Sequence, residues 1–288
     1  MTGTPADRPA VTGQDVSRPR VTCLFAVTDT PVPDDVLAAT PGHDGGGPLR
    51  ILDAGPLRLV VQDVPAAAFG EEALAQRLGR PDELERCARA HHRAVEAAAR
   101  KGTAVPLPMA TLYLDDRNAV RAVTGRAASL RALLDRLRGR TEWAVKVHCA
   151  GPGRAFGAAG DGGPAHGGPA DGRSYLSRVS ARRRTEREAR EAALAQAHAI
   201  DRELRRYAVA ATRHRPQSEQ LTGRSAPQLL NAAYLVDDAR RAAFLEAAGR
   251  PVPGDGTAVE VTLSGPWIPY SFARLDEAAC DAREEVRA

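Results

Sequence analysis

The stretch EWAVKVHC, residues 142–149, alternates between two faces as a half-buried β-strand does. The apolar face carries Trp143, Val145, Val147 and Cys149, and the polar face carries Glu142, Lys146 and His148. Before it, the chain shows a strand pattern over 21–27, a short helix, a hairpin pattern over 49–64 and two helical segments. Strand, helix, hairpin, helix and strand, with one extra helix, is the order of a ferredoxin-like sandwich. We therefore expect residues 21–150 to form an N-terminal ferredoxin-like domain that this strand closes.

The second half of the chain predicts a smaller α+β domain over residues 173–274. Helical periodicity begins at Ser174 and continues to about Thr212. The second half of this long helix carries an apolar stripe, formed by Leu194, Ala197, Ile200, Leu204, Tyr207 and Ala211. Two strand patterns, over 229–236 and 258–263, follow with a helix between them. The predicted fold class is therefore α+β, with two domains.

Three further stretches have compositions that do not favour a packed fold. Residues 1–20 contain no apolar segment of the kind that a signal peptide has, and we expect a disordered tail. Residues 151–172 are mostly Gly, Pro, Ala and Asp, which predicts a flexible linker or loop. Residues 275–288 are expected to form a charged C-terminal tail.

The composition narrows the class of protein. The 288 residues are 43% hydrophobic and 26% charged, with a net charge of +4, as expected of a globular protein with its own core. No run approaches the roughly 18 apolar residues that a membrane-spanning helix needs. The four cysteines are widely separated and form no C-x-x-C pair, which disfavours a zinc site and fits a reducing compartment. We expect a cytoplasmic protein that binds no membrane.

Catalytic, cofactor and metal-binding patterns do not emerge from the sequence. Phe156 stands where a phosphate-binding loop after residue 149 would need its third glycine. His91 and His92 are neighbours on a predicted helix and point about 100° apart, so they cannot share a metal ion. Three Asp pairs stand at predicted helix starts, where capping explains them, at 34–35, 115–116 and 237–238. We expect no cofactor, no metal and no enzyme activity.

Positive charge is concentrated in the long helix. Between Arg173 and Arg215 twelve arginines stand against five acidic residues, so the remainder of the chain is net negative. Three of the arginines are adjacent, at Arg182, Arg183 and Arg184. A solvated helix face and a protein-docking surface both fit this pattern. The alternative is a nucleic-acid-binding helix over 178–206, although no aromatic residue interrupts the arginines to stack on bases.

The segment SGPWIPYSF, residues 264–272, gathers three of the twelve aromatic residues of the chain, Trp267, Tyr270 and Phe272. Two prolines stiffen it. Such a segment can close the core of the second domain, because each aromatic side chain buries a large area. It can equally present an exposed aromatic patch to a partner. The pattern fits both interpretations.

Five segments together resemble the gas vesicle accessory proteins F and L. They are LYLDD at 112–116, GRTEWAVKVHC at 139–149, SYLSR at 174–178, LLNAAYLVDDARRAAF at 229–244 and LSGPWIPYSF at 263–272. They follow the order of the family and, with the first strand, extend over most of the chain. The last segment is similar to the family's G-P-W-P-P-Y-S-F, with Ile268 in place of one proline.

This resemblance implies a two-domain α+β protein with ferredoxin-like elements, which is an accessory or minor structural protein of gas vesicles and not an enzyme. It implies binding to the major shell protein and to other gas vesicle accessory proteins during assembly, in the cytoplasm and at the vesicle. Nucleic acid is not expected as a partner. Our candidates for partner binding are the adjacent arginines and the C-terminal aromatic residues, namely Arg182, Arg183, Arg184, Trp267, Tyr270 and Phe272.

Overall fold

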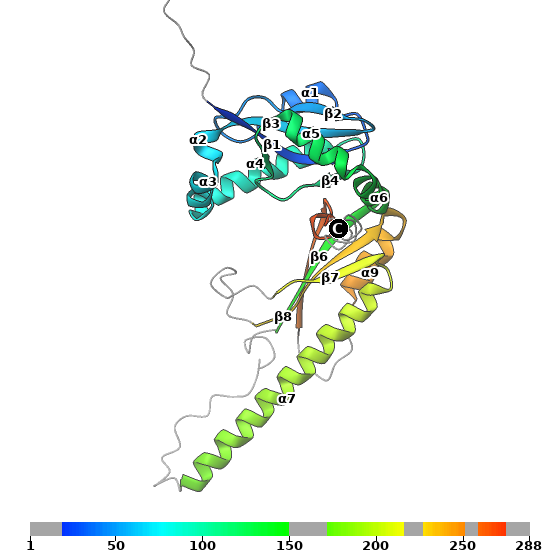
Figure 1. The fold of residues 1–288 in the computed structure, drawn as a ribbon. Coiled ribbons are helices and arrows are strands. Elements are labelled where there is room, and N and C mark those ends of the chain that lie inside the picture. The colour runs from blue at the N-terminus through cyan, green and yellow to red at the C-terminus, as the bar shows by residue number, and fades with distance from the viewer. Residues whose placement is uncertain (1–18, 150–171, 216–226, 251–258, 275–288) are drawn as a thin grey trace, which may run out of the picture. The chain divides into compact units, whose positions relative to one another are not determined.

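The computed structural model describes four parts of the chain, residues 19–149, 172–215, 227–250 and 259–274. Side chains are described throughout these parts except over 172–179 and at Arg182. The chain divides into two compact units with the main division close to Ala127; residues 102–106 group with the second unit, but we describe their strand with the first sheet, in which it pairs. Each unit combines a sheet with helices, which confirms the α+β fold class (Figure 1).

The first unit is built on a sheet with the strand order β2-β3-β1-β4, and β5 also pairs with β1. The strands are β1 (Arg20–Thr28), β2 (Arg50–Ala54), β3 (Leu57–Pro65), β4 (Ala104–Pro106) and β5 (Leu112–Tyr113). β2 and β3 form the predicted hairpin, with Gly55 in the turn at a φ of +66°. β1 pairs antiparallel with β3, and its residues 23–27 are completely buried.

The first unit has the predicted short helix and the two predicted helical segments, and it has two further helices, over 66–69 and 71–78, that were not predicted. In chain order the helices are α1 (Asp34–Ala38), α2 (Ala66–Phe69), α3 (Glu71–Leu78), α4 (Pro81–Ala99) and α5 (Asp116–Gly125). α4 packs on β1 and buries one face that includes Cys87, His91 and Val95. Asp115 caps α5 as predicted, because its Oδ1 accepts a hydrogen bond of 2.7 Å from the Asn118 backbone N–H.

The second unit is built on β6 (Arg140–Cys149), β7 (Ala210–Arg213), β8 (Gln228–Asp237) and β9 (Val259–Trp267). The strand order is β7-β8-β6-β9, and every neighbouring pair is antiparallel. β6 is therefore a central strand of the second unit and does not close the first. The domain boundary expected at residue 150 is wrong because strict alternation predicts a strand but not its partners, which lie far along the chain in β8 and β9.

Both units nevertheless have the strand order of a ferredoxin-like sandwich. The fourth strand of the first sheet is β4, and it takes the position in which we expected the strand over 142–149. When the strands of each unit are numbered from its own start, both orders read 2-3-1-4. The second unit also includes β6 and α6 (Ala127–Leu137), so it is larger than the domain expected over 173–274.

The core of the second unit lies between its sheet and two helices, α7 (Gly172–Arg205) and α9 (Arg241–Gly249). Trp143, Tyr234 and Phe244 pack at its centre, with the Tyr234 and Phe244 ring centroids 5.6 Å apart. α7 ends at Arg205, earlier than the predicted Thr212, because the chain enters β7 and the Val209 N–H donates to the Leu235 carbonyl at 2.8 Å.

Two short helical turns complete the second unit, η1 (Asp238–Arg240) after β8 and η2 (Tyr270–Phe272) after β9. Asp237 does not cap the helix that follows it. Its Oδ1 instead accepts a hydrogen bond of 2.7 Å from Arg140 Nε, which joins the paired ends of β6 and β8. The segments expected as tails and linker, 1–20, 151–172 and 275–288, lie outside the described residues except at 19–20 and 172.

Candidate functional site

The aromatic segment, residues 264–272, runs from the end of β9 into η2 and presents its three aromatic side chains differently. Trp267 is 45% exposed and Tyr270 36% exposed, whereas Phe272 is 7% exposed. The Trp267 indole Nε1 lies 3.3 Å from Ser264 Oγ, to which it donates a hydrogen bond. The segment therefore divides between two environments: Phe272 is buried, and Trp267 and Tyr270, which we call the exposed pair, face solvent.

A buried carboxylate of β6 holds this segment in place. The Glu142 side chain accepts two hydrogen bonds from Ser271, one from the backbone N–H at 2.8 Å and one from Oγ at 2.6 Å. His214 Nε2 lies 3.2 Å from the same Ser271 Oγ. Burial raises the pKa of Glu142, although both hydrogen bonds from Ser271 and the nearby His214 oppose that rise. Glu142, Ser271 and His214 together form what we call the Ser271 anchor.

A glycine sets the path of the chain into the aromatic segment. Gly265 has a φ of +140°, a conformation that side chains other than glycine rarely adopt. A Cβ at this position would lie 2.9 Å from Trp143 Cε3 and 3.0 Å from the Glu142 carbonyl oxygen. The register between β6 and β9 shifts here, since Glu142 pairs with Trp267 and Ala144 with Ser264, leaving a β-bulge opposite Trp143.

The arginines predicted to bind a partner lie on the first half of α7, where every described side chain from Ser180 to Glu191 is exposed. Arg183 and Arg184 belong to this stretch, while the Arg182 side chain lies outside the described residues. Arg187 pairs with Glu191 at 3.6 Å, one helical turn away, and both side chains are well exposed. The prediction of an exposed basic helix agrees with these positions, but its partner is not tested by them.

The second half of α7 is joined to the sheet by a buried aspartate. Asp201 is 1% exposed and accepts hydrogen bonds from three partners, Tyr234 Oη at 2.6 Å, Arg213 Nη2 at 2.5 Å and Arg205 Nε at 3.1 Å. Burial favours a higher pKa for Asp201, but the three hydrogen bonds outweigh it and hold the pKa below its usual value. The group is thus a fully paired structural link, which we call the Asp201 cluster.

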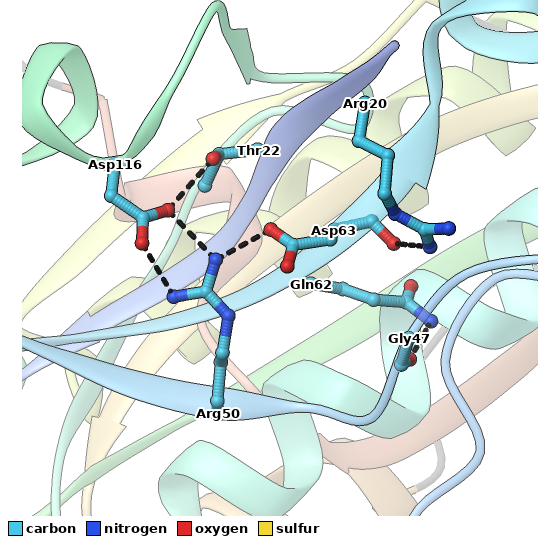
Figure 2. A network of polar contacts seen from close by, with 7 residues as sticks. All are labelled: Arg20, Thr22, Gly47, Arg50, Gln62, Asp63 and Asp116. Carbon is cyan, nitrogen blue, oxygen red and sulfur yellow. Dashed lines mark hydrogen bonds and ion pairs between the residues drawn. The ribbon is translucent and has the colours of Figure 1, made fainter. Parts of the chain in front are cut away.

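The first unit has a polar hollow of about 520 Å³, lined by residues of β1, β2 and β3 and by the start of α5. Arg50 crosses it and bridges β2 to two carboxylates, as Figure 2 shows. Its Nη1 and Nη2 donate to the two oxygens of Asp116 at 2.9 and 2.7 Å, and Nη2 also donates to Asp63 Oδ1 at 2.5 Å. Thr22 Oγ1 donates to Asp116 at 2.8 Å.

We call this group the Arg50 clamp. Because its carboxylates are already engaged by Arg50, the clamp is suited to joining three strands to the start of α5 and not to binding a ligand. Within the described parts of the chain, no group of three His, Cys, Asp or Glu side chains could hold a metal ion. No described helix is long and apolar enough to cross a membrane.

Residues 22–274 match the sequence model of a family described as gas vesicle synthesis protein GvpL/GvpF. The chain belongs to the GvpL/GvpF family. It is 40% identical over 274 residues to gas vesicle protein L of Streptomyces sp. (strain CB03234), across 94% of this chain and 99% of that protein. The protein is therefore a gas vesicle protein.

Two solved structures of GvpF share its fold. GvpF from Anabaena sp. PCC7120 matches with a TM-score of 0.59 and 16% identity, over 90% of this chain and 98% of that one. GvpF from Microcystis aeruginosa matches with a TM-score of 0.54 and 16% identity, over 88% and 99% of the two chains. At this level of identity the likeness concerns the fold.

In this GvpL/GvpF chain, two of the segments that carry the family resemblance lie against each other. Residues 139–149 include β6 with Glu142, and residues 263–272 include Gly265 and Ser271, which contact it. Sequence reasoning singled out Trp267, Tyr270 and Phe272 but missed Glu142, Ser271 and His214. The strand alternation placed Glu142 on the polar face, where a charged residue is ordinary, so no sequence signal indicated that it is buried and hydrogen-bonded.

Proposed function

We propose that this protein is a non-enzymatic accessory protein of gas vesicle assembly, which binds the major shell protein and other gas vesicle proteins in the cytoplasm. Membership of the GvpL/GvpF family supports the gas vesicle role. The observation that carries the proposed binding is the exposed pair Trp267 and Tyr270 on a backbone fixed by the Ser271 anchor.

The exposed pair has the properties of a binding hot spot. Trp and Tyr combine a large apolar area with a polar group and are enriched where proteins bind each other. Their exposure in a folded chain leaves apolar area in water that a partner would cover. Because the backbone of the segment is held by Glu142 and by two prolines, little conformational freedom would be lost on binding.

The exposed basic stretch of α7 supports a second, electrostatic contribution. Arg183 and Arg184 lie in a run of exposed side chains with more basic than acidic residues. Such a surface accelerates association with an acidic partner and weakens as salt rises. We assign the aromatic pair to the salt-independent part of binding and the helix to the salt-dependent part.

The experiment is a co-expression pull-down with the major shell protein of the same genome, at low and high salt. The variants are Trp267→Ala with Tyr270→Ala, and Arg183→Glu with Arg184→Glu. The matched charge control is Arg121→Glu with Arg131→Glu, because both arginines are exposed on other helices. We expect the aromatic variant to lose retention at both salt concentrations, and the Arg183/Arg184 variant to lose it mainly at low salt.

Retention of the shell protein by both variants would contradict the assigned surface, and no retention by the unaltered chain would overturn direct shell binding. Equal losses in the Arg183/Arg184 variant and in its charge control would show a general effect of net charge. A basic helix that binds random RNA with steep salt dependence, and not the shell protein, would favour the nucleic-acid alternative.

A further inference from the structure

β9 forms one edge of the second sheet and, within the described residues, pairs with β6 on one side only. The opposite edge, β7, has four residues, whereas β9 has nine. A long edge strand presents unpaired N–H and C=O groups, and proteins usually protect such edges with Lys, Pro or short strands. β9 contains no basic residue, and its single proline, Pro266, comes near its end.

The side chains of β9 are arranged so that another strand could extend the sheet. Val259, Val261 and Leu263 pack beside the core of the second unit but stay partly exposed. Glu260 and Thr262 are exposed on the other face. A strand laid along this edge would continue the apolar row on one face and the polar row on the other.

We propose that the strand that pairs here is β9 of a second copy of this chain, antiparallel and related by a two-fold axis at Thr262. This register places Val261 opposite Leu263 and Glu260 opposite Ser264, with Thr262 opposite its own copy. Apolar residues then face apolar residues, and a Thr–Thr pair lies on the axis. The interface is isologous, as the commonest protein dimers are.

Three features of the strand select this register. The apolar face of one β9 must lie beside the apolar face of the other, and this requirement excludes every register shifted by one residue. Pro266 has no N–H to donate and Gly265 lies in the β-bulge, so the regular stretch is 259–264 and its middle falls between Val261 and Thr262. The two Glu260 carboxylates lie four residues from each other along the paired strands, about 14 Å apart, so the only acidic side chain of β9 is kept away from its copy.

The proposal does not rest on shell binding, since the partner is the chain itself and the pairing stretch of β9, residues 259–264, ends before Trp267. Its first test is disulfide trapping in the full chain, with Cys149→Ser and Cys280→Ser as background. Thr262→Cys would place two thiols across the axis, whereas Glu260→Cys on the same face would hold them beyond the roughly 7 Å limit for a disulfide. Both positions are exposed.

Under mild oxidation we expect about tenfold more linked dimer from Thr262→Cys than from Glu260→Cys. Equal linking at the two positions, or none at residue 262, would overturn the proposal. The second test is the mass of the unaltered chain in solution, which we expect to rise above 30.6 kDa as concentration increases.

Thr262→Asp would place like charges opposite each other, so we expect its association to be about tenfold weaker. Thr262→Ser keeps the size and polarity close to those of the unaltered strand and is the matched control. A mass that stays at 30.6 kDa, or the same association in Thr262→Asp as in the control, would overturn the proposal.

Discussion

The central strand of the first unit, β1, is completely buried over residues 23–27, whereas its counterpart in the second unit, β6, alternates between buried and partly exposed positions over 143–147. The two sheets share one strand order but end differently. The fourth strand of the first sheet, β4, has three residues, and that of the second, β9, has nine and continues into the aromatic segment. The same strand order therefore occurs in units with different roles, because the surfaces proposed to bind partners all belong to the second unit.

The polar groups that link the helices and strands within each unit also differ between the two units. In the Arg50 clamp the side chains of Arg50, Asp63 and Asp116 are 29%, 42% and 45% exposed. In the Asp201 cluster the carboxylate is 2% exposed. A buried charge that loses its partners costs more free energy than an exposed one, because water cannot replace the lost hydrogen bonds. The same kind of substitution should therefore have unequal effects in the two units.

The largest effect is expected from Asp201→Ala. Removing the carboxylate leaves the buried Tyr234 hydroxyl without its acceptor and returns two half-exposed arginines to water, so the free energy of unfolding of the second unit should fall by about 3 kcal/mol. Tryptophan fluorescence during urea unfolding measures this unit alone, since both tryptophans, Trp143 and Trp267, belong to it. A loss below about 1 kcal/mol would show that the cluster is not the main link between α7 and the sheet.

Mild acid should destabilise the first unit selectively. Burial lowers the pKa of His43 and His91 from 6.5 to about 4 in the folded chain. The neutral forms are favoured by folding, so this stability is complete above pH 6.5 and is lost as the pH falls toward 4. At pH 5.5 the loss is about 1.4 kcal/mol for each histidine and about 3 kcal/mol for both.

The second unit should respond differently to the same acid. The raised pKa of Glu142 means that its folded carboxyl takes up a proton more readily than the unfolded one, so acid does not remove stability there. The pKa of Asp201 is lowered, and its contribution is lost only below its ordinary value of 3.8. At pH 5.5 far-UV circular dichroism should report earlier unfolding than tryptophan fluorescence. If the circular dichroism and fluorescence transitions coincided at pH 5.5 as well as at pH 7, the assignment of the acid effect to the histidines of the first unit would be contradicted.

Gly265→Ala tests the approach of the aromatic segment to β6. The new Cβ would require a strained φ and would crowd Trp143, so we expect a loss of about 2 kcal/mol. Gly249→Ala, at the end of α9 in the same unit, is the control, since beyond its chain neighbours and its own helix backbone no atom lies within 4 Å of its Cβ position. Equal stability of the two variants in thermal unfolding followed by tryptophan fluorescence would show that the close approach is not needed.

The smallest effect is expected from Arg50→Ala. Because the clamp is partly exposed, water and salt screen its ion pairs, and the first unit should lose about 1 kcal/mol. Far-UV circular dichroism should detect the change while tryptophan fluorescence does not. If Arg50→Ala lowered stability as much as Asp201→Ala, the contrast in burial between the two units would not govern their energetics.

Local patterns in the sequence predicted most elements but not how they combine. The strand over 142–149 and the hairpin over 49–64 depend on nearby residues, and both were confirmed, although Glu142 and His148, expected on the solvent side of that strand, are buried. The partners of β6 could not be predicted, because strand alternation is the same whichever strand lies beside it. The Arg50 clamp was missed for a similar reason, since Thr22, Arg50 and Asp116 are brought together by the fold and not by spacing.

The aromatic candidates show the same limit at the level of single residues. Phe272 and Trp267 have similar apolar character, and the sequence could not assign one to the core and the other to solvent. The buried Glu142, which fixes the segment through Ser271, lies more than a hundred residues earlier in the chain. Its role follows from the pairing of β6 with β9 and is invisible before that pairing is known.

The β-bulge at Gly265 changes the face of the sheet on which the following residues of β9 lie. Val259, Val261 and Leu263 share the core face, and by simple alternation residue 267 would join them. At the bulge two residues of β9 lie opposite one residue of β6, so Trp267 pairs with Glu142 and lies on the opposite face. A single extra backbone position therefore converts what would be a core tryptophan into a surface one, and the surface proposed to bind a partner depends on chain length at this point as much as on the aromatic residue itself.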